Sequence, residues 1–236
     1  MSRLATRIRN AGAAQARPIG FSATPAKTPR AIVIVAPAGS AAEVTAAVEA
    51  GADAISFDGA VSDIPAAIKA AGDTPIGVVL EAASGDDVQT AADTGADFFA
   101  FDDGAASPAA LQVDDIGRIA ILGDDRSEEA VRLLAGVNLD ALFVDRAEVT
   151  SVRAQLALRQ LASWANAPLL AGTTSTDVDA LTALRDAGAG AILARGDLAA
   201  TIAAADEVKP PKRAPSTAQP LVPAPPGDDF DDDDDF

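Results

Sequence analysis

The 236-residue chain contains no cysteine, no histidine and no tyrosine. Without cysteine, a disulfide framework, a thiolate nucleophile, a zinc–thiolate site and an iron–sulfur cluster are excluded. Without histidine, Ser-His-Asp and Cys-His catalysis, histidine-ligated metal sites and the usual acid–base group near neutral pH are excluded as well. Tyrosine would have offered another route for proton transfer. The sequence therefore indicates the fold more clearly than any reaction.

Basic residues are scarce: 18 lysines and arginines face 35 aspartates and glutamates, for a net charge of −17. A chain this acidic repels nucleic acid, so we expect no nucleic-acid partner. No stretch approaches the ~20 apolar residues of a membrane helix, and the first residues lack the apolar core of a secretory signal. We therefore expect no membrane association and a cytoplasmic protein. The 49% of hydrophobic residues suffices for a real core.

Short apolar runs alternate with alanine-rich stretches along the middle of the chain. The runs are rich in Ile, Val, Leu, Phe and Ala, as strands buried on both faces are. The predicted strands are Ala31–Ala36, Ala54–Asp58, Ile76–Glu81, Phe98–Asp102, Arg118–Gly123, Ala141–Asp145, Leu169–Gly172 and Ala191–Arg195. Helical stretches follow, several of them opening at Ser or Thr, the residues that cap helix N-termini. Examples are Ser40–Ala50, Ser84–Thr94, Ser127–Leu134, Ser151–Trp164 and Thr176–Ala187.

The turns before every second strand repeat. Gly-Ala-Asp precedes the second and fourth strands, and related turns centred on Asn138 and Gly188 precede the sixth and eighth. A glycine or asparagine in each turn supplies the left-handed residue that ends a helix. This four-fold repeat of a strand–helix–strand–helix unit favours an α/β (β/α)8 barrel, or TIM barrel. A doubly wound open sheet is the alternative, but five or six units would suit it better.

Composition divides the chain into three parts. Residues 1–30 form a basic N-terminal arm, with a short helix over Arg3–Ala14 that is predicted to cover the bottom of the barrel. Residues 31–206 form the barrel. Residues 207–236 are a proline-rich, disordered linker followed by an acidic tail, because the composition changes abruptly at Lys209.

The repeat also predicts which side chains face the barrel interior. Side chains alternate along a strand, so positions one, three and five of the even strands should point inward. Those positions hold Ala54, Phe98, Ala141 and Ala191, then Ser56, Ala100, Phe143 and Leu193, then Asp58, Asp102, Asp145 and Arg195. Positions two and four are uniformly apolar and should face the helices. The topmost even layer is therefore predicted to be polar and to lie at the C-terminal face, where barrel enzymes act.

Three readings of this polar layer remain open. The group of Asp58, Asp102 and Asp145 beside Arg195 has a structural reading, as an ion cluster that closes the barrel or as aspartates that cap the following loops. It can also be a Mg²⁺ site with oxygen ligands or an acid–base site. Crowded carboxylates raise one another's pKa, which suits acid–base work. Glu81 ends a neighbouring strand and is a further candidate. No lysine lies in a predicted strand, which disfavours Schiff-base chemistry.

The seventh and eighth strands resemble those of a known superfamily. Ala171-Gly172-Thr173-Thr174-Ser175 and the stretch from Ala187 to Ala194 are similar to the aldolase-type, phosphate-binding TIM barrels. That superfamily includes flavin-binding nitronate monooxygenases and enzymes of phosphosugars. The resemblance implies that Gly172, Thr173, Thr174 and Gly196 lie near a phosphate, held by backbone N–H groups at a helix N-terminus. It implies FMN or a phosphosugar as a candidate ligand. The residue-level alternative is an ordinary helix cap at Thr173–Thr176.

The last nine residues combine seven aspartates with two phenylalanines. This tip resembles the C-terminal tip of bacterial single-stranded DNA-binding proteins, which docks partner proteins. The resemblance implies Asp228, Phe230, Asp235 and Phe236 as partner-binding residues. A solvated tail that aids solubility is one alternative, and docking onto the chain's own Arg3, Arg7 and Arg9 is another.

Two functions follow from the sequence. The first is a small-molecule enzyme that binds a phosphate-bearing ligand or Mg²⁺ at the C-terminal face of the barrel. The second is a non-catalytic barrel that recruits a protein partner through its acidic tail. The polar layer favours the first, whereas short loops and the absence of His, Cys, Tyr and a barrel lysine favour the second.

Overall fold

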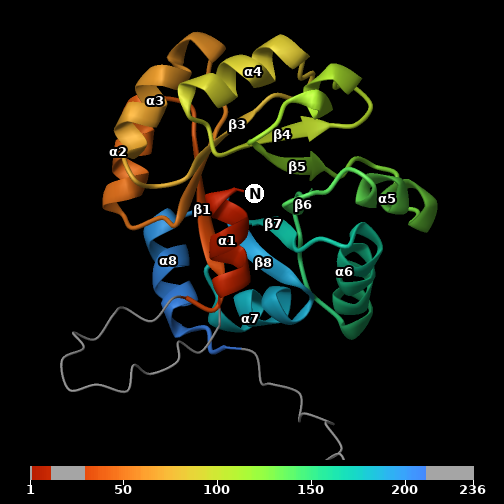
Figure 1. The fold of residues 1–236 in the computed structure, drawn as a ribbon. Coiled ribbons are helices and arrows are strands. Elements are labelled where there is room, and N and C mark those ends of the chain that lie inside the picture. Colours follow the sequence, from red (N-terminus) through yellow and green to blue (C-terminus); the bar gives the residue numbers. More distant parts are fainter. Residues whose placement is uncertain (1, 12–29, 211–236) are drawn as a thin grey trace, which may run out of the picture.

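Eight parallel strands close into a barrel in chain order, with helices around the outside (Figure 1). The computed structural model describes residues 2–11 and 30–210. Its closed sheet confirms the predicted TIM barrel over the open-sheet alternative. Most of the basic arm and the whole acidic tail, with Asp228, Phe230, Asp235 and Phe236, lie outside the described residues. No helix in the described ranges is long and apolar enough to cross a membrane.

The strands and helices alternate as the sequence predicts, with one exception. The strands are β1 (Val33–Ala38), β2 (Ala54–Phe57), β3 (Ile76–Val79), β4 (Phe98–Asp102), β5 (Gly117–Ile121), β6 (Ala141–Val144), β7 (Leu169–Thr173) and β8 (Ala189–Ala194). The helices are α1 (Arg3–Asn10), α2 (Ala41–Glu49), α3 (Ile64–Ala71), α4 (Gly85–Thr94), α5 (Glu128–Ala135), α6 (Val152–Ala165), α7 (Val178–Asp186) and α8 (Leu198–Glu207). Two 3-10 turns complete the elements, η1 (Val61–Asp63) and η2 (Pro108–Gln112). The exception is η2, which stands where an α-helix should follow β4.

Serine caps set the start of four helices. Ser40, Ser84, Ser127 and Ser151 each accept a hydrogen bond from a backbone N–H in the first turn of the following helix. These caps confirm the predicted starts of α2, α4, α5 and α6.

The seventh helix begins later than predicted. Asp177, rather than Thr176, caps α7 by accepting a hydrogen bond from the Ala180 N–H at 3.0 Å. The Thr173 hydroxyl instead accepts from the Ser175 N–H at 3.1 Å, inside the loop. The helix therefore starts at Val178, because the hydroxyls of Thr173 and Ser175 accept hydrogen bonds within the loop that precedes it.

The core has two layers that match the predicted alternation. The inner cluster contains seven of the eight inward residues predicted at positions one and three, and the eighth, Ser56, is buried as well. The outer cluster contains all eight residues predicted to face the helices, namely Ile55, Phe57, Phe99, Phe101, Leu142, Val144, Ile192 and Ala194. The strand register, read from the turns, therefore decides which side chains fill the barrel.

Helix α1 closes the bottom of the barrel, as the sequence predicts, although it ends at Asn10 rather than at Ala14, because Ala11 already has an extended backbone. Leu4 and Ile8 belong to the inner cluster. A Cβ added to Gly190 of β8 would lie 2.4 Å from Ile8 Cγ2, so only glycine leaves room for this contact. The helix thus fills the end of the interior that the strands leave open.

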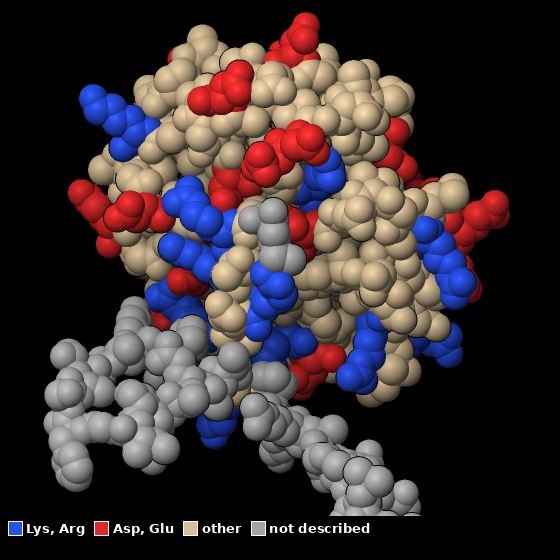
Figure 2. Space-filling model, viewed as in Figure 1, with Lys and Arg blue, Asp and Glu red and all other residues tan. Residues whose placement is uncertain are grey.

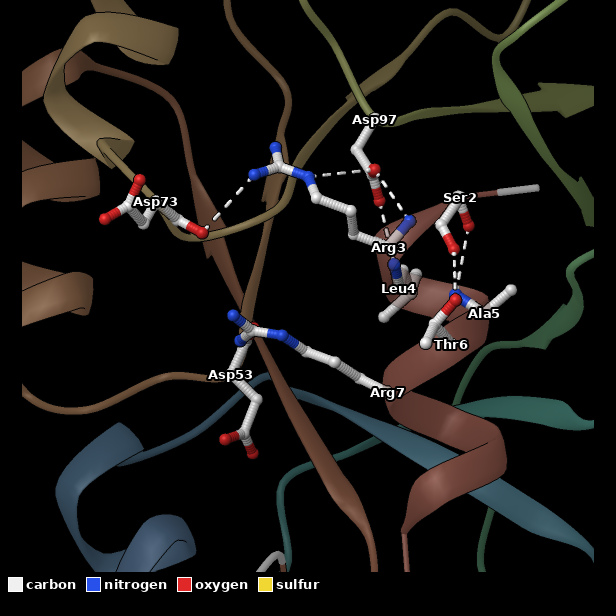
Figure 3. Close-up of polar contacts among 9 residues, drawn as sticks. All are labelled: Ser2, Arg3, Leu4, Ala5, Thr6, Arg7, Asp53, Asp73 and Asp97. Atoms are coloured by element: carbon white, nitrogen blue, oxygen red, sulfur yellow. Dashed lines mark hydrogen bonds and ion pairs between the residues drawn. The ribbon is translucent and has the colours of Figure 1, made fainter.

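A carboxylate fixes the start of α1 (Figure 3). Asp97, in the Gly-Ala-Asp turn before β4, accepts hydrogen bonds from the backbone N–H groups of Arg3 and Leu4, both at 2.8 Å. Arg3 Nε lies 3.3 Å from the same carboxylate, whose side chain is only 6% exposed. These N–H groups have no partner inside the helix, and the positive end of the helix dipole favours a negative charge there.

Replacing Asp97 with alanine is expected to lower the free energy of unfolding by about 2 kcal/mol, because two helix N–H groups and one guanidinium lose their acceptor. Urea denaturation at neutral pH measures the change. The matched control is Asp114→Ala, an exposed aspartate in the loop before β5. Equal midpoints for the two variants would show that α1 is not held through Asp97.

Candidate functional site

The carboxyl ends of β6, β7 and β8 surround a cavity of about 310 Å³. Its lining residues come from the end of each strand and the loop that follows, namely Asp145, Arg146, Glu148, Gly172, Thr173, Thr174 and Arg195. The predicted polar-layer residues of β6 and β8 and three predicted phosphate-binding residues therefore share one cavity. This is the end of the barrel where the loops after the strands meet.

Arg195 is the best-positioned polar side chain of this cavity. Its Nε donates to Asp145 Oδ1 at 3.1 Å, and its guanidinium lies over the Phe143 ring, 5.7 Å from the ring centre. The two terminal nitrogens, Nη1 and Nη2, have no partner among the described residues. With its side chain 44% exposed, Arg195 can offer both nitrogens to a ligand. A planar guanidinium held in this way suits bidentate binding of a phosphate or a carboxylate.

Gly172 makes the contact between β6 and β7 close enough for this arrangement. A Cβ at this position would lie 2.7 Å from Asp145 Oδ1 and 3.2 Å from the Phe143 ring. The Gly172 carbonyl accepts a hydrogen bond from the Ala147 N–H at 2.8 Å, which ties the loop after β6 to β7. The missing side chain of Gly172 thus leaves the space that the Asp145 carboxylate occupies.

Gly196 stands outside the cavity lining but packs beside it. A Cβ there would lie 3.0 Å from the carbonyl oxygen of Thr174, so the loops after β7 and β8 approach closely. Thr174 is exposed, whereas Thr173 is buried and uses its hydroxyl within the loop. Of the four residues that the resemblance implies, Thr174 is the one whose side chain faces solvent and lines the cavity.

Arg146 and Glu148 complete the charged lining. Arg146 has a φ of 49°, in the left-handed region that arginine seldom adopts, and strained backbone of this kind gathers at functional sites. Within the described residues Arg146 forms no ion pair, and it is exposed. Glu148 was not among the predicted site residues, because it follows β6 by four positions and no register argument reaches into the loop. Two cations and two carboxylates therefore face the same space.

The other predicted polar-layer residues do not join this group. Asp58 and Glu81 are exposed, and Asp102 accepts a hydrogen bond from the Gly104 N–H at 2.8 Å. Of the three aspartates, Asp145 alone pairs with Arg195. Asp58 lies one position beyond the end of β2, just as Asp145 and Arg195 lie one position beyond β6 and β8, so the end of the strand does not explain why Asp58 stands apart. Asp102 ends β4 and turns toward its own loop.

The candidate cofactors fit this geometry unequally. Within residues 2–11 and 30–210, no three acidic side chains lie close enough together to hold a metal ion between them. The cavity lining contains donors for a phosphate group, from Arg146, Thr174 and Arg195. The donor set suits a small anionic group.

Comparison with known proteins supports the fold alone. No protein-family profile matches the chain, and no curated protein sequence does. A solved structure of tryptophan synthase from M. tuberculosis is similar, with a TM-score of 0.61 and 13% identity over 88% of this chain and 97% of that chain. Dihydropteroate synthase from Xanthomonas albilineans is similar as well, with a TM-score of 0.56 and 18% identity over 74% of this chain and 91% of that chain. At such low identity, the likeness establishes that the chain has a TIM-barrel fold like these enzymes.

The substitution Gly172→Ala is expected to destabilise the protein by roughly 1–3 kcal/mol, because its methyl group would push the Asp145 carboxylate and the Phe143 ring apart. Gly123→Ala is the matched control, since nothing lies within 4 Å of the added Cβ. Guanidinium denaturation of both variants measures the difference. An unchanged midpoint for Gly172→Ala would mean that the loop after β6 moves freely.

Proposed function

We propose that this chain is a small-molecule enzyme whose substrate carries a phosphate or a similar anionic group, bound in the cavity at the ends of β6, β7 and β8. The observation that carries the proposal is the way in which neighbouring residues hold the Arg195 side chain. Asp145 holds its Nε and Phe143 supports its face, while both terminal nitrogens stay available. Ordering an arginine before the ligand arrives lowers the entropy cost of binding.

The charges of the cavity favour an anionic group near Arg195 rather than throughout the cavity. Arg146 and Arg195 offset Asp145 and Glu148, so the lining carries no net formal charge. An acidic body repels anions at long range, and the two arginines provide the local attraction that the substrate needs. The cavity of about 310 Å³ lies at the small end of the ~300–1,000 Å³ usual for ligand sites, which suits a small ester.

The chemistry available to this chain is proton transfer by carboxylates. Asp145 and Glu148 line the same cavity as Arg195, so a substrate bound through its anionic group would have two carboxylates beside it. A carboxylate within hydrogen-bond reach of a substrate can act as a general acid or base. The similar barrels named above are enzymes of small molecules, which favours catalysis over a purely structural role.

Calorimetric titration of the full chain with inorganic phosphate and with a simple phosphate ester tests the binding step. We expect binding by the native chain and a roughly 10- to 100-fold loss in Arg195→Gln, from the ~1.5–3 kcal/mol of hydrogen bonds to charged groups. Arg132→Gln is the matched control, because Arg132 is an exposed arginine of α5 paired with Glu128. Absence of binding, or equal affinity in Arg195→Gln, would refute the proposed site.

Catalysis needs a separate experiment. Incubation of the chain with phosphate esters that bind, followed by phosphorus NMR, is expected to show conversion that Asp145→Asn slows. If every bound ester is recovered unchanged, the chain binds these esters without converting them, and the proposal that it is an enzyme is refuted.

A further inference from the structure

The exposed side of α1 is basic, in a chain that is otherwise acidic. Leu4, Ala5 and Ile8 are buried in the barrel bottom, whereas Arg3, Arg7 and Arg9 are exposed. The helix contains no acidic residue. Figure 2 shows arginine and lysine side chains gathered around this helix at the bottom of the barrel. We refer to Arg3, Arg7 and Arg9 as the α1 basic side.

Two carboxylates next to the α1 basic side, those of Asp97 and Asp53, already have partners. Asp97 accepts from the first N–H groups of α1 and from Arg3. Asp53 accepts from the Ile34 N–H at 2.9 Å and pairs with Arg30 at 3.0 Å. These two aspartates are therefore used by the barrel itself, and they do not neutralise the whole basic side.

Arg3 and Arg7 retain unused donors. Arg3 uses Nε for Asp97 and Nη1 for the Asp73 carbonyl, and Arg7 uses Nη1 for the Asp53 carbonyl. The Nη2 group of each has no partner among the described residues. Since the side chain of Arg3 is 53% exposed, further carboxylates can reach this surface.

The chain leaves the barrel at this same end. Arg30, just before β1, pairs with Asp206 of α8 at 2.5 Å, which places the end of α8 beside the start of β1 (Figure 1). Burial alone would lower the pKa of Arg30, but the hydrogen bonds and charges of Asp206 and Asp53 together outweigh that effect and raise it. The described residues end three positions after α8, at Pro210. The residues that follow Pro210 therefore start on the face that carries the α1 basic side.

We propose that the acidic segment 228–236 binds the α1 basic side of its own chain. The segment holds seven aspartates, whose carboxylates can accept from the Nη2 groups of Arg3 and Arg7. Residues 211–227 connect the two, and at ~3.1 Å per residue in extended form they span ~50 Å, far more than the ~12 Å length of α1. A tether of this kind gives an effective concentration near the millimolar range, so weak ion pairs suffice.

The cavity at the opposite end of the barrel takes no part in this contact. The proposal therefore stands independently of the proposed enzyme: substrate binding through Arg195 and docking of segment 228–236 can each fail without the other. Docking through ion pairs at an exposed surface also predicts a strong dependence on salt.

Because the chain contains no cysteine, one introduced cysteine can be labelled specifically, and this makes the proposal testable. A nitroxide label on the single cysteine of Gly227→Cys in the full chain should broaden the backbone NMR signals of residues 3–10 in dilute buffer. Sodium chloride at about 1 M, where the Debye length is about 3 Å, should restore the intensity. Signals that keep full intensity in dilute buffer would overturn the proposal, as would broadening centred on another face of the barrel.

Two variants separate the contact from the fold. Converting Asp231 through Asp235 to asparagine leaves the barrel untouched and should restore the α1 signals. Arg7→Gln with Arg9→Gln should restore them too, whereas Arg153→Gln with Arg159→Gln on α6 should not. Broadening that survives the asparagine variant would overturn the proposal. Broadening that appears only when unlabelled and labelled chains are mixed would assign the contact to a second copy and overturn docking within one chain.

Discussion

The interior of this barrel contains two phenylalanines, Phe98 and Phe143, and each is accommodated by a glycine on a neighbouring strand. Phe98 lies against Gly77, where an added Cβ would come within 2.1 Å of the ring, and Phe143 lies against Gly172. A closed eight-stranded barrel has room for layered side chains only if large residues meet small ones. At the bottom, this pairing leaves a space that α1 fills with Leu4 and Ile8. At the top, it leaves the Phe143 ring beneath Arg195.

The interior of the barrel could be predicted from the sequence because strand geometry is periodic. Once the Gly-Ala-Asp turns fix the start of each even strand, alternation places every side chain as far as the strand extends. Asp145 and Arg195 were predicted as neighbours on this basis, and they form an ion pair. The same reasoning does not bring Asp58 and Asp102 to this pair, because alternation no longer fixes a residue that follows its strand, as Asp58, Asp145 and Arg195 all do, and Asp102 bonds to its own loop. Glu148 escaped prediction for the same reason, since loop backbone follows no period.

The turns contained more information than the sequence alone revealed. Their glycines predicted strand boundaries, but the role of their aspartates depends on a tertiary contact. Asp97 binds the start of α1, a helix that lies 93 residues earlier in the chain at Leu4. Asp53 binds the backbone of β1 and Arg30. The aspartates of the repeated Gly-Ala-Asp turns therefore stabilise the bottom of the barrel through contacts with residues distant in the sequence, which a local sequence pattern does not reveal.

The contact between Ile8 and Gly190 constrains the order in which this protein can fold. The helix that seals the barrel is synthesised first, yet its docking surface includes the last strand, which leaves the ribosome about 180 residues later. Until then, Leu4 and Ile8 have no completed interior to enter. The first and last strands must also pair, Val33 with Ala191, before the barrel closes. Long-range closure of this kind slows folding, so the apolar side of α1, with Leu4 and Ile8, must stay soluble until β8 has been synthesised.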